Sequence, residues 1–138
     1  GIITPYLPKG ESASLGKVVL GTVKDDIHDI GKNLVAAQLR VHGFEVIDIG
    51  IDQPSMNFID KAEEVGANII AMSGFLTSTI PYFTDVINYL KDMGLRKKYK
   101  VIIGGGTTST EYAESIGADA WAANAVDAVQ VCKNLIPG

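Results

Sequence analysis

The residues that could do chemistry gather in one short segment, 21–34, which reads GTVKDDIHDIGKNL. His28, one of two histidines in the chain, stands two residues after Asp26 and three before Gly31. In an extended loop, side chains two residues apart point the same way. Asp26 could then accept a hydrogen bond from one ring nitrogen of His28 and leave the other free to bind a metal. An ordinary loop histidine beside helix-capping aspartates is the alternative interpretation.

Five apolar runs rich in Val and Ile predict the strands that position this segment. They cover residues 17–23, 44–50, 68–73, 100–105 and 118–123. Each is apolar on both faces, which is typical of buried parallel strands. Between these runs, apolar residues recur at helical spacing, as Ile30, Leu34, Ala37 and Val41 do in the first predicted helix. Four glycines stand where helices should end: Gly43, Gly66, Gly94 and Gly117. This alternation predicts an α/β, flavodoxin-like (Rossmann-like), doubly wound five-stranded parallel sheet.

Composition limits the domain organisation. The chain has 138 residues, 46% of them hydrophobic, so it can bury the core of one domain. The opening segment is rich in Pro, Gly and hydroxyl residues and has no period. We expect residues 1–16 to be a linker or lead-in and residues 17–138 to be the folded domain.

Charge and cysteine content exclude several classes of function. The net charge is −4 and no Lys/Arg cluster is dense enough to follow a phosphate backbone, so we expect no nucleic-acid partner. Cys132 is the only cysteine, which rules out a disulfide framework within the chain and favours a cytoplasmic protein. No apolar run has membrane-spanning length, so no membrane partner is expected.

Ligand chemistry should concentrate at one edge of the predicted sheet. The loops KDDIHDIGKN, SGFLTST and GGGTTST follow the first, third and fourth predicted strands. The carboxyl ends of parallel strands meet at one edge, and ligands bind there near the point where the strand order reverses. The three loops therefore predict one composite site.

The motifs in these loops resemble a known family. Asp26-x-His28-x-x-Gly31, then Ser73, then the pair Gly104 and Gly105, resemble the D-x-H-x-x-G, S-x-L and G-G signature of cobalamin-binding domains. The resemblance covers roughly residues 8–136. Within that family, the sequence is most similar to the corrinoid carrier proteins of methyltransferase systems and to the cobalamin domain of methionine synthase.

The resemblance implies a cofactor held base-off and His-on. His28 would be the lower axial ligand of cobalt, and Asp26 its hydrogen-bond partner. The hydroxyl of Thr79 or Ser78 would complete the relay. Gly31 would let the corrin ring approach the backbone closely, because it has no side chain.

The resemblance also implies a slot for the nucleotide tail of the cofactor. Ser73 and Thr77 would contact the tail through their hydroxyls. Gly104 and Gly105 would leave space for its dimethylbenzimidazole, and Ala125 would add a contact from the last helix. The sequence departs from the family where Phe75 replaces the usual leucine, and Gly106 replaces a common alanine.

By the same resemblance, the expected function is that of a non-catalytic methyl carrier. It would hold methylcobalamin or a related corrinoid, with its cobalt, and pass a methyl group from a substrate:corrinoid methyltransferase to a second, corrinoid:acceptor methyltransferase that methylates a thiol or tetrahydrofolate. A reductive activator would be a further partner. Family carriers have an N-terminal helical cap, and residues 1–16 are too short for one, so we expect either a fragment or a partner that acts as a lid.

Two alternatives stay open at this point. The cobalamin-binding small subunit of a carbon-skeleton mutase has the same three motifs. A phosphoreceiver-like signalling domain shares the topology, and Asp25 and Asp26 could supply its paired acids. A receiver also needs an aspartate after the third strand and a lysine after the fifth, where this sequence has Ser73 and residues 122–124, AAN.

Overall fold

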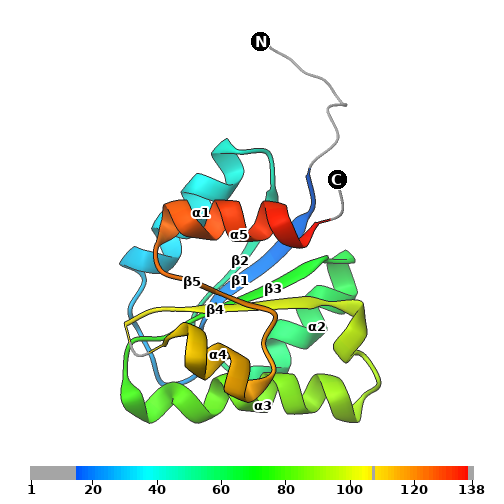
Figure 1. The fold of residues 1–138 in the computed structure, drawn as a ribbon. Coiled ribbons are helices and arrows are strands. Elements are labelled where there is room, and N and C mark those ends of the chain that lie inside the picture. Colours follow the sequence, from blue (N-terminus) through cyan, green and yellow to red (C-terminus); the bar gives the residue numbers. More distant parts are fainter. Residues whose placement is uncertain (1–14, 107, 137–138) are drawn as a thin grey trace.

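The computed structural model describes residues 15–106 and 108–136, so the predicted lead-in lies almost entirely outside the described residues. The described chain forms a five-stranded parallel sheet in the order β2-β1-β3-β4-β5 (Figure 1). The strands are β1 (Lys17–Val23), β2 (Glu45–Gln53), β3 (Ile69–Ser73), β4 (Lys100–Gly104) and β5 (Ala120–Ala122). The predicted α/β flavodoxin-like fold is confirmed, and its strand order reverses between β1 and β3.

Helices cover both faces of the sheet. They are α1 (Ile30–Val41), α2 (Ser55–Val65), α3 (Ile80–Asp92), α4 (Thr110–Ile116) and α5 (Ala125–Leu135). Figure 1 shows α1 and α5 on one face and α2, α3 and α4 on the other. Each of the four glycines predicted at helix ends has a positive φ. At Gly66 and Gly117 this left-handed conformation directly caps α2 and α4.

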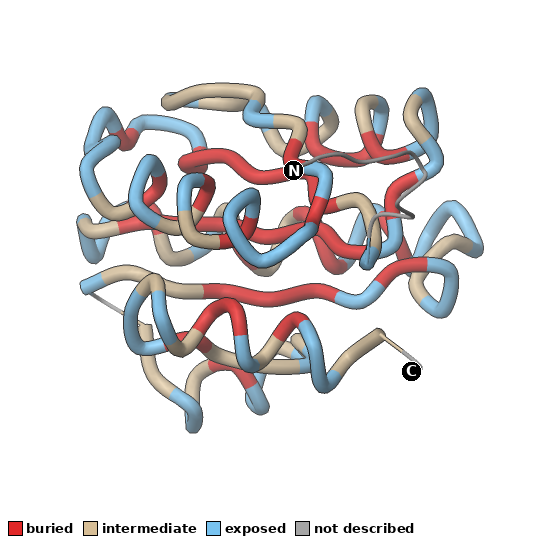
Figure 2. Tube along the Cα trace, turned by 90° about the horizontal axis from the view of Figure 1, so that it is seen from above, coloured by how far each residue is buried: buried red, intermediate tan, exposed pale blue. Residues whose placement is uncertain are grey.

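The sheet separates two apolar cores. Val18, Leu20 and Ile69 pack against α1 and α5, whereas Val19 and Ile70 face α2, α3 and α4. This alternation follows from the period of two along a strand. Figure 2 shows the buried segments running through the centre of the molecule with the exposed faces of the helices outside them. No helix of the described part of the chain is long and apolar enough to cross a membrane.

The second strand differs from its prediction. β2 begins at Glu45 and runs to Gln53, past the predicted end at Gly50. It lies at the edge of the sheet, and most of its residues are exposed or half-buried. The prediction that all five strands are buried on both faces is therefore wrong for β2, because an edge strand with Glu45, Asp48 and Asp52 can keep those carboxylates in water.

The first helix forms as predicted, but its apolar stripe faces outward. Ile30, Leu34 and Val41 have 76%, 56% and 78% of their surface exposed. The buried face of α1 instead contains Ala36, Leu39 and Lys32. The buried ammonium of Lys32 lies 2.6 Å from a carboxylate oxygen of Asp48 on β2, and this pairing makes its burial tolerable.

Candidate functional site

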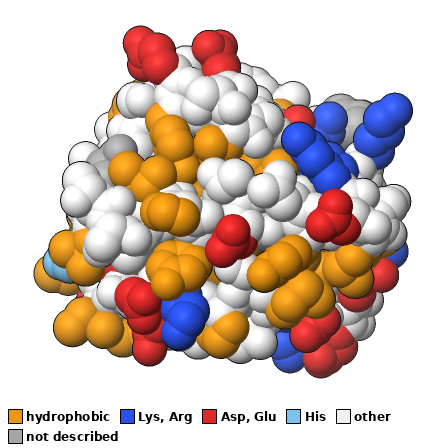
Figure 3. All heavy atoms as spheres, turned by 90° about the horizontal axis from the view of Figure 1, so that it is seen from below, with side chains coloured by type: hydrophobic (Ala, Val, Ile, Leu, Met, Phe, Trp, Pro, Cys, Tyr) orange, Lys and Arg blue, Asp and Glu red, His pale blue; other side chains and the backbone are white. Residues whose placement is uncertain are grey.

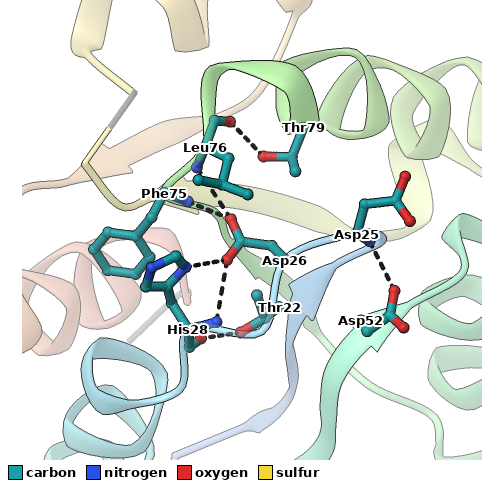
Figure 4. Close-up of polar contacts among 8 residues, drawn as sticks. All are labelled: Thr22, Asp25, Asp26, His28, Asp52, Phe75, Leu76 and Thr79. Atoms are coloured by element: carbon teal, nitrogen blue, oxygen red, sulfur yellow. Dashed lines mark hydrogen bonds and ion pairs between the residues drawn. The ribbon is translucent and has the colours of Figure 1, made fainter.

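The loop after β1 places the carboxylate of Asp26 inside the protein, where backbone groups and His28 surround it (Figure 4). Its Oδ2 accepts the backbone N–H groups of Phe75 at 2.6 Å and of Leu76 at 3.2 Å. Its Oδ1 accepts the backbone N–H of His28 at 3.1 Å. Asp26 thereby fastens the loop after β1 to the loop after β3, across the point where the strand order reverses.

The imidazole of His28 is oriented by this carboxylate. Its Nδ1 lies 2.6 Å from Oδ1 of Asp26, and about half of the side chain is exposed. A carboxylate acceptor fixes the proton on Nδ1, which leaves the lone pair on Nε2. No described residue hydrogen-bonds to Nε2, so this nitrogen could bind a metal. The predicted contact between Asp26 and His28 is present.

The pKa of Asp26 is lowered although the group is buried. Burial by itself raises this pKa, because it disfavours the charged form. The hydrogen bonds from Phe75, His28 and Leu76 outweigh that effect. The carboxylate therefore stays ionised and can hold an imidazole in one orientation or stabilise it when it is protonated.

The predicted hydroxyl of the relay points elsewhere. Thr79 is buried, but its hydroxyl donates to the carbonyl oxygen of Leu76 at 2.6 Å and not to Asp26. Ser78 and Thr77 are exposed. The backbone N–H groups of Phe75 and Leu76 bind Oδ2 of Asp26 in place of a hydroxyl. Thr79 instead shapes the loop that presents those N–H groups.

A cavity of about 500 Å³ lies between the sheet and helices α1 and α5, and one of its lining residues is Phe75, whose ring contacts that of His28. Such a volume is within the range of small-molecule sites. Five of the predicted residues line it: Gly31, Ser73, Gly104, Gly105 and Ala125. Thr77 does not. Deeper in the cavity, the walls are apolar and include Leu20, Leu39, Ala71, Ile102 and Ala128.

The cavity suits an elongated, mostly apolar group with a polar atom. Ser73 is 9% exposed, and among the described residues its hydroxyl has no hydrogen-bond partner. A buried hydroxyl without a partner is costly, so a ligand atom that bonds to it would be stabilising. Together with the metal-competent Nε2 of His28 outside, the residues present fit a cobalamin with its nucleotide tail inserted.

Gly105 is a glycine for a reason that the sequence did not reveal. Its φ is +113°, and a Cβ atom there would collide with the backbone carbonyl of Gly74. The expectation that Gly105 only leaves room for the tail is therefore incomplete. Close approach of the two backbones already excludes a side chain, because the loops after β3 and β4 touch here.

The sequence did not reveal the positions of Phe75 and Cys132 in the site. The ring of Phe75 lies beside that of His28, with centroids 5.1 Å apart. Cys132 is a buried residue of α5 and also lines the cavity. Burial raises the pKa of its thiol to about 12, so it stays protonated. Cys132 follows Ala125 and Ala128 at helical spacing, and this spacing could have indicated that the three residues share the face of α5 that lines the cavity.

Asp25, whose role the sequence left open, holds the loop in place. It has a left-handed backbone with φ of 69°, which is uncommon for a residue with a side chain. Its N–H donates to Oδ1 of Asp52 at 2.7 Å, and its carboxylate accepts the hydroxyl of Tyr82 at 3.0 Å. Asp52 in turn donates its N–H to the carbonyl of Asp26. These contacts fix the loop against β2 and α3, and Figure 4 shows the one between Asp25 and Asp52.

A family model described as the B12 binding domain matches residues 16–130. The chain belongs to the B12-binding family. A corrinoid protein of Desulfitobacterium hafniense is 47% identical to this B12-binding chain over 98% of it and over 64% of its own length. Dimethylamine corrinoid protein 3 of Methanosarcina mazei is 49% identical, over 94% of this chain and 78% of its own length.

Among solved structures, the methanol:cobalamin methyltransferase complex of Methanosarcina barkeri contains a similar domain. It superimposes with a TM-score of 0.85 at 28% identity, over 91% of this chain and 48% of that one. The B12-binding chain spans 64% of the length of the D. hafniense relative, which is less than two thirds. The predicted resemblance to corrinoid proteins is confirmed.

Proposed function

We propose that this chain is a methyl-carrying corrinoid protein that binds cobalamin base-off, with Nε2 of His28 as the lower axial ligand of cobalt. The observation that carries the proposal is the pair formed by His28 and Asp26, together with an apolar cavity lined by Phe75, whose ring packs against His28. The pair orients an imidazole for a metal, and the cavity offers a place for the displaced nucleotide tail. Residues 17–138 would be the cobalamin-binding domain.

Several residues of the chain would hold the cofactor. Asp26 keeps the imidazole in one tautomer, and Ser73 offers a hydroxyl to the tail. Gly31, Gly104 and Ala125 line the cavity and, with no side chain or only a methyl group, leave space for the tail. When bound, the corrinoid supplies a cobalt centre that accepts and releases a methyl group. The chain would orient that centre, and partner enzymes would catalyse the transfers.

The proposed partners are a methyltransferase that delivers the methyl group and one that removes it, with a reductive activator as a third. The relatives support a carrier over a mutase subunit, since they are corrinoid proteins, and one similar structure is a methyltransferase complex. The outward apolar stripe of α1 beside the cavity supports a covering partner or lid. A methylamine, methanol or a methoxylated compound would be the donor.

The first experiment tests the axial ligand. Adding hydroxocobalamin to the parent should shift its visible absorption spectrum to that of a histidine-ligated form. His28→Ala should retain cofactor through the tail cavity but lose that spectrum. His42→Ala is the matched control, since His42 is the other histidine and its side chain hydrogen-bonds only to the carbonyl oxygen of Gln38 among the described residues. An unchanged spectrum in His28→Ala would refute the assignment.

The second experiment tests methyl transfer. The cobalamin-loaded protein is incubated under reducing conditions with a candidate methyltransferase and its methyl donor. Formation of a methylated corrinoid on the protein, followed by its loss when a second methyltransferase and thiol are added, would support the carrier function. Rearrangement of a carbon skeleton by the adenosylcobalamin-loaded protein with a mutase large subunit would point to the alternative.

A further inference from the structure

The polar side chains of the cavity lie at its rim, where the strands end. Ser73 is the last residue of β3, and Thr108 and Asn124 follow β4 and β5. The hydroxyl of Thr108 is already engaged, because it donates to the carbonyl oxygen of Gly105 at 2.7 Å and accepts the indole N–H of Trp121 at 2.9 Å. The hydroxyl of Ser73 has no such partner among the described residues, so the rim can still bind a polar atom of a ligand.

The inner wall of the cavity is apolar. Ala71 lies two residues before Ser73 on the same face of β3, about 7 Å further in. Leu20 on β1 and Ile102 on β4 pair with Ala71, so the backbone groups at this depth belong to the sheet. Of the side chains here, only that of Cys132 carries a donor, and a thiol is a weak one. The inner wall comprises Leu20, Leu39, Ala71, Ile102, Ala128 and Cys132.

This gradient of polarity distinguishes between the bases that can end a nucleotide tail. The sugar is attached to the five-membered ring of a benzimidazole or a purine, so the six-membered ring of a base that enters from the rim lies deepest. In dimethylbenzimidazole that ring carries only methyl groups. In adenine it contains two nitrogen atoms and carries an amino group. Against the inner wall these polar atoms would lose their water and gain no partner, which is costly.

We propose that the inner wall makes this chain selective for corrinoids whose tail ends in an apolar base, such as dimethylbenzimidazole, over corrinoids whose tail ends in a purine. The inference rests on the proposed function, because the tail must occupy the cavity. An apolar pocket rejects a ligand with one added polar group by up to about 100-fold. A polar group placed on the inner wall should reduce this discrimination, because it offers the purine a partner.

The test compares cobalamin with the corrinoid in which adenine replaces dimethylbenzimidazole. Each is titrated into the parent and its variants, and binding is followed by quenching of Trp121, the single tryptophan of the chain, which lines the cavity. The two free corrinoids differ in how firmly their own base binds cobalt. This difference cancels when the ratio of the two affinities is compared between variants. In Ala128→Ser, the ratio of cobalamin affinity to adenine-corrinoid affinity should fall about fivefold.

Two further variants complete the test of selectivity. Cys132→Ser places a hydroxyl one turn further along α5 with little change in size, and it should lower the ratio in the same way. Ala37→Ser is the control, because Ala37 is exposed on α1 and does not line the cavity. Its ratio should equal that of the parent. A fall in either inner-wall variant supports the proposal, and a ratio that stays at the parent's value in both refutes it.

Ala128→Leu distinguishes failure of the selectivity from failure of the tail cavity. Its larger side chain fills the inner end of the cavity, so it should weaken the binding of both corrinoids. If it weakens both while the two serine variants leave the ratio unchanged, the tail cavity stands and the selectivity alone is refuted. If Ala128→Leu binds both corrinoids as tightly as the parent, the tail does not enter this cavity, and both proposals about the tail fall.

Discussion

A Cβ atom on Gly105 would collide with the backbone carbonyl of Gly74, so the loops after β3 and β4 are in direct contact. This contact, and not the cofactor alone, requires glycine at position 105. It also means that substitutions at Gly105 report on folding before they report on binding.

We expect Gly105→Ala to destabilise the protein by about 2 to 4 kcal/mol, because it combines a left-handed backbone with a steric collision. Gly94→Ala is the matched control, since Gly94 also has a positive φ of 73° but nothing lies within 4 Å of its added Cβ. It should cost about 1 kcal/mol. Urea unfolding of both variants gives the two values, and equal losses would contradict the collision.

Ala128→Leu tests the cavity without disturbing that contact. Ala128 is buried on α5 and lines the cavity, so a leucine would fill part of the space in which we propose that the nucleotide tail binds. Cobalamin affinity should fall at least tenfold, which corresponds to about 1.4 kcal/mol. The melting temperature should stay or rise, because added apolar contacts fill a void. Titration calorimetry measures the affinity, and Ala37→Leu on the exposed face of α1 is the control.

The buried ion pair between Lys32 and Asp48 should respond unequally to loss of either partner. Asp48→Ala leaves the buried ammonium of Lys32 with the side-chain oxygen of Asn33 as an acceptor. It should cost about 2 to 3 kcal/mol, less than the loss of a partner in a fully buried pair, because Asp48 is a quarter exposed. Lys32→Met replaces the ammonium by apolar bulk and should be near neutral. Unfolding curves that show the larger loss in Lys32→Met would contradict this account.

The pH dependence of stability should include a contribution from Glu63. Hydrogen bonds from the ammonium of Lys98 and the hydroxyl of Tyr99 lower the pKa of this carboxyl. A carboxyl with a lowered folded-state pKa stabilises the fold above its unfolded pKa, about 4.3. That stabilisation disappears as the pH falls through the lower, folded value. Glu63→Gln should therefore melt below the parent at pH 7, and the difference should shrink toward pH 3.

The control for this prediction is the next residue. Glu64→Gln removes an exposed carboxylate that pairs with Lys61 on the same helix, and such pairs contribute little to stability. Its melting temperature should follow that of the parent at every pH. A constant difference between Glu63→Gln and the parent from pH 7 to pH 3 would show that the carboxylate contributes through contacts other than charge.

Much of the fold could be predicted because its signals are local. Apolar runs predicted the strands of the sheet, and glycines predicted where the helices end. The spacing of Asp26 and His28 predicted their contact, since both lie in one short loop. Which face of α1 is buried could not be predicted, because Ile30 and Leu34 look like core residues and Lys32 does not. Burial of Lys32 depends on a carboxylate from another strand.

The missed features of the site depend on contacts between loops that are distant in sequence. The path of the loop after β3 decides that backbone N–H groups, and not the hydroxyl of Thr79, reach Asp26. It also decides that Phe75 meets His28 and that Gly74 meets Gly105. No periodicity or spacing encodes these encounters, because each depends on the register of β3 against its neighbours.

The surface of the protein is mixed in character. On the face seen in Figure 3, which carries α3, hydrophobic side chains lie among acidic and basic ones. Tyr89 and Met93 of α3 are 40% and 50% exposed, whereas Ile30 and Leu34 of α1 are more exposed and lie next to the cavity entrance. A covering partner would bury more apolar surface on α1 than on α3.

The all-parallel strand order has a consequence for how the protein is made. Every connection between consecutive strands is a crossover, so no two strands can form a local hairpin, and pairing must wait for distant segments. β1, which leads into His28, lies between β2 and β3, while α5, the last helix of the described residues, lines the cavity. The ribosome must therefore release the whole segment from β1 to α5 before the cavity is complete. We expect any cofactor that binds in this cavity to be loaded only after this domain has been synthesised.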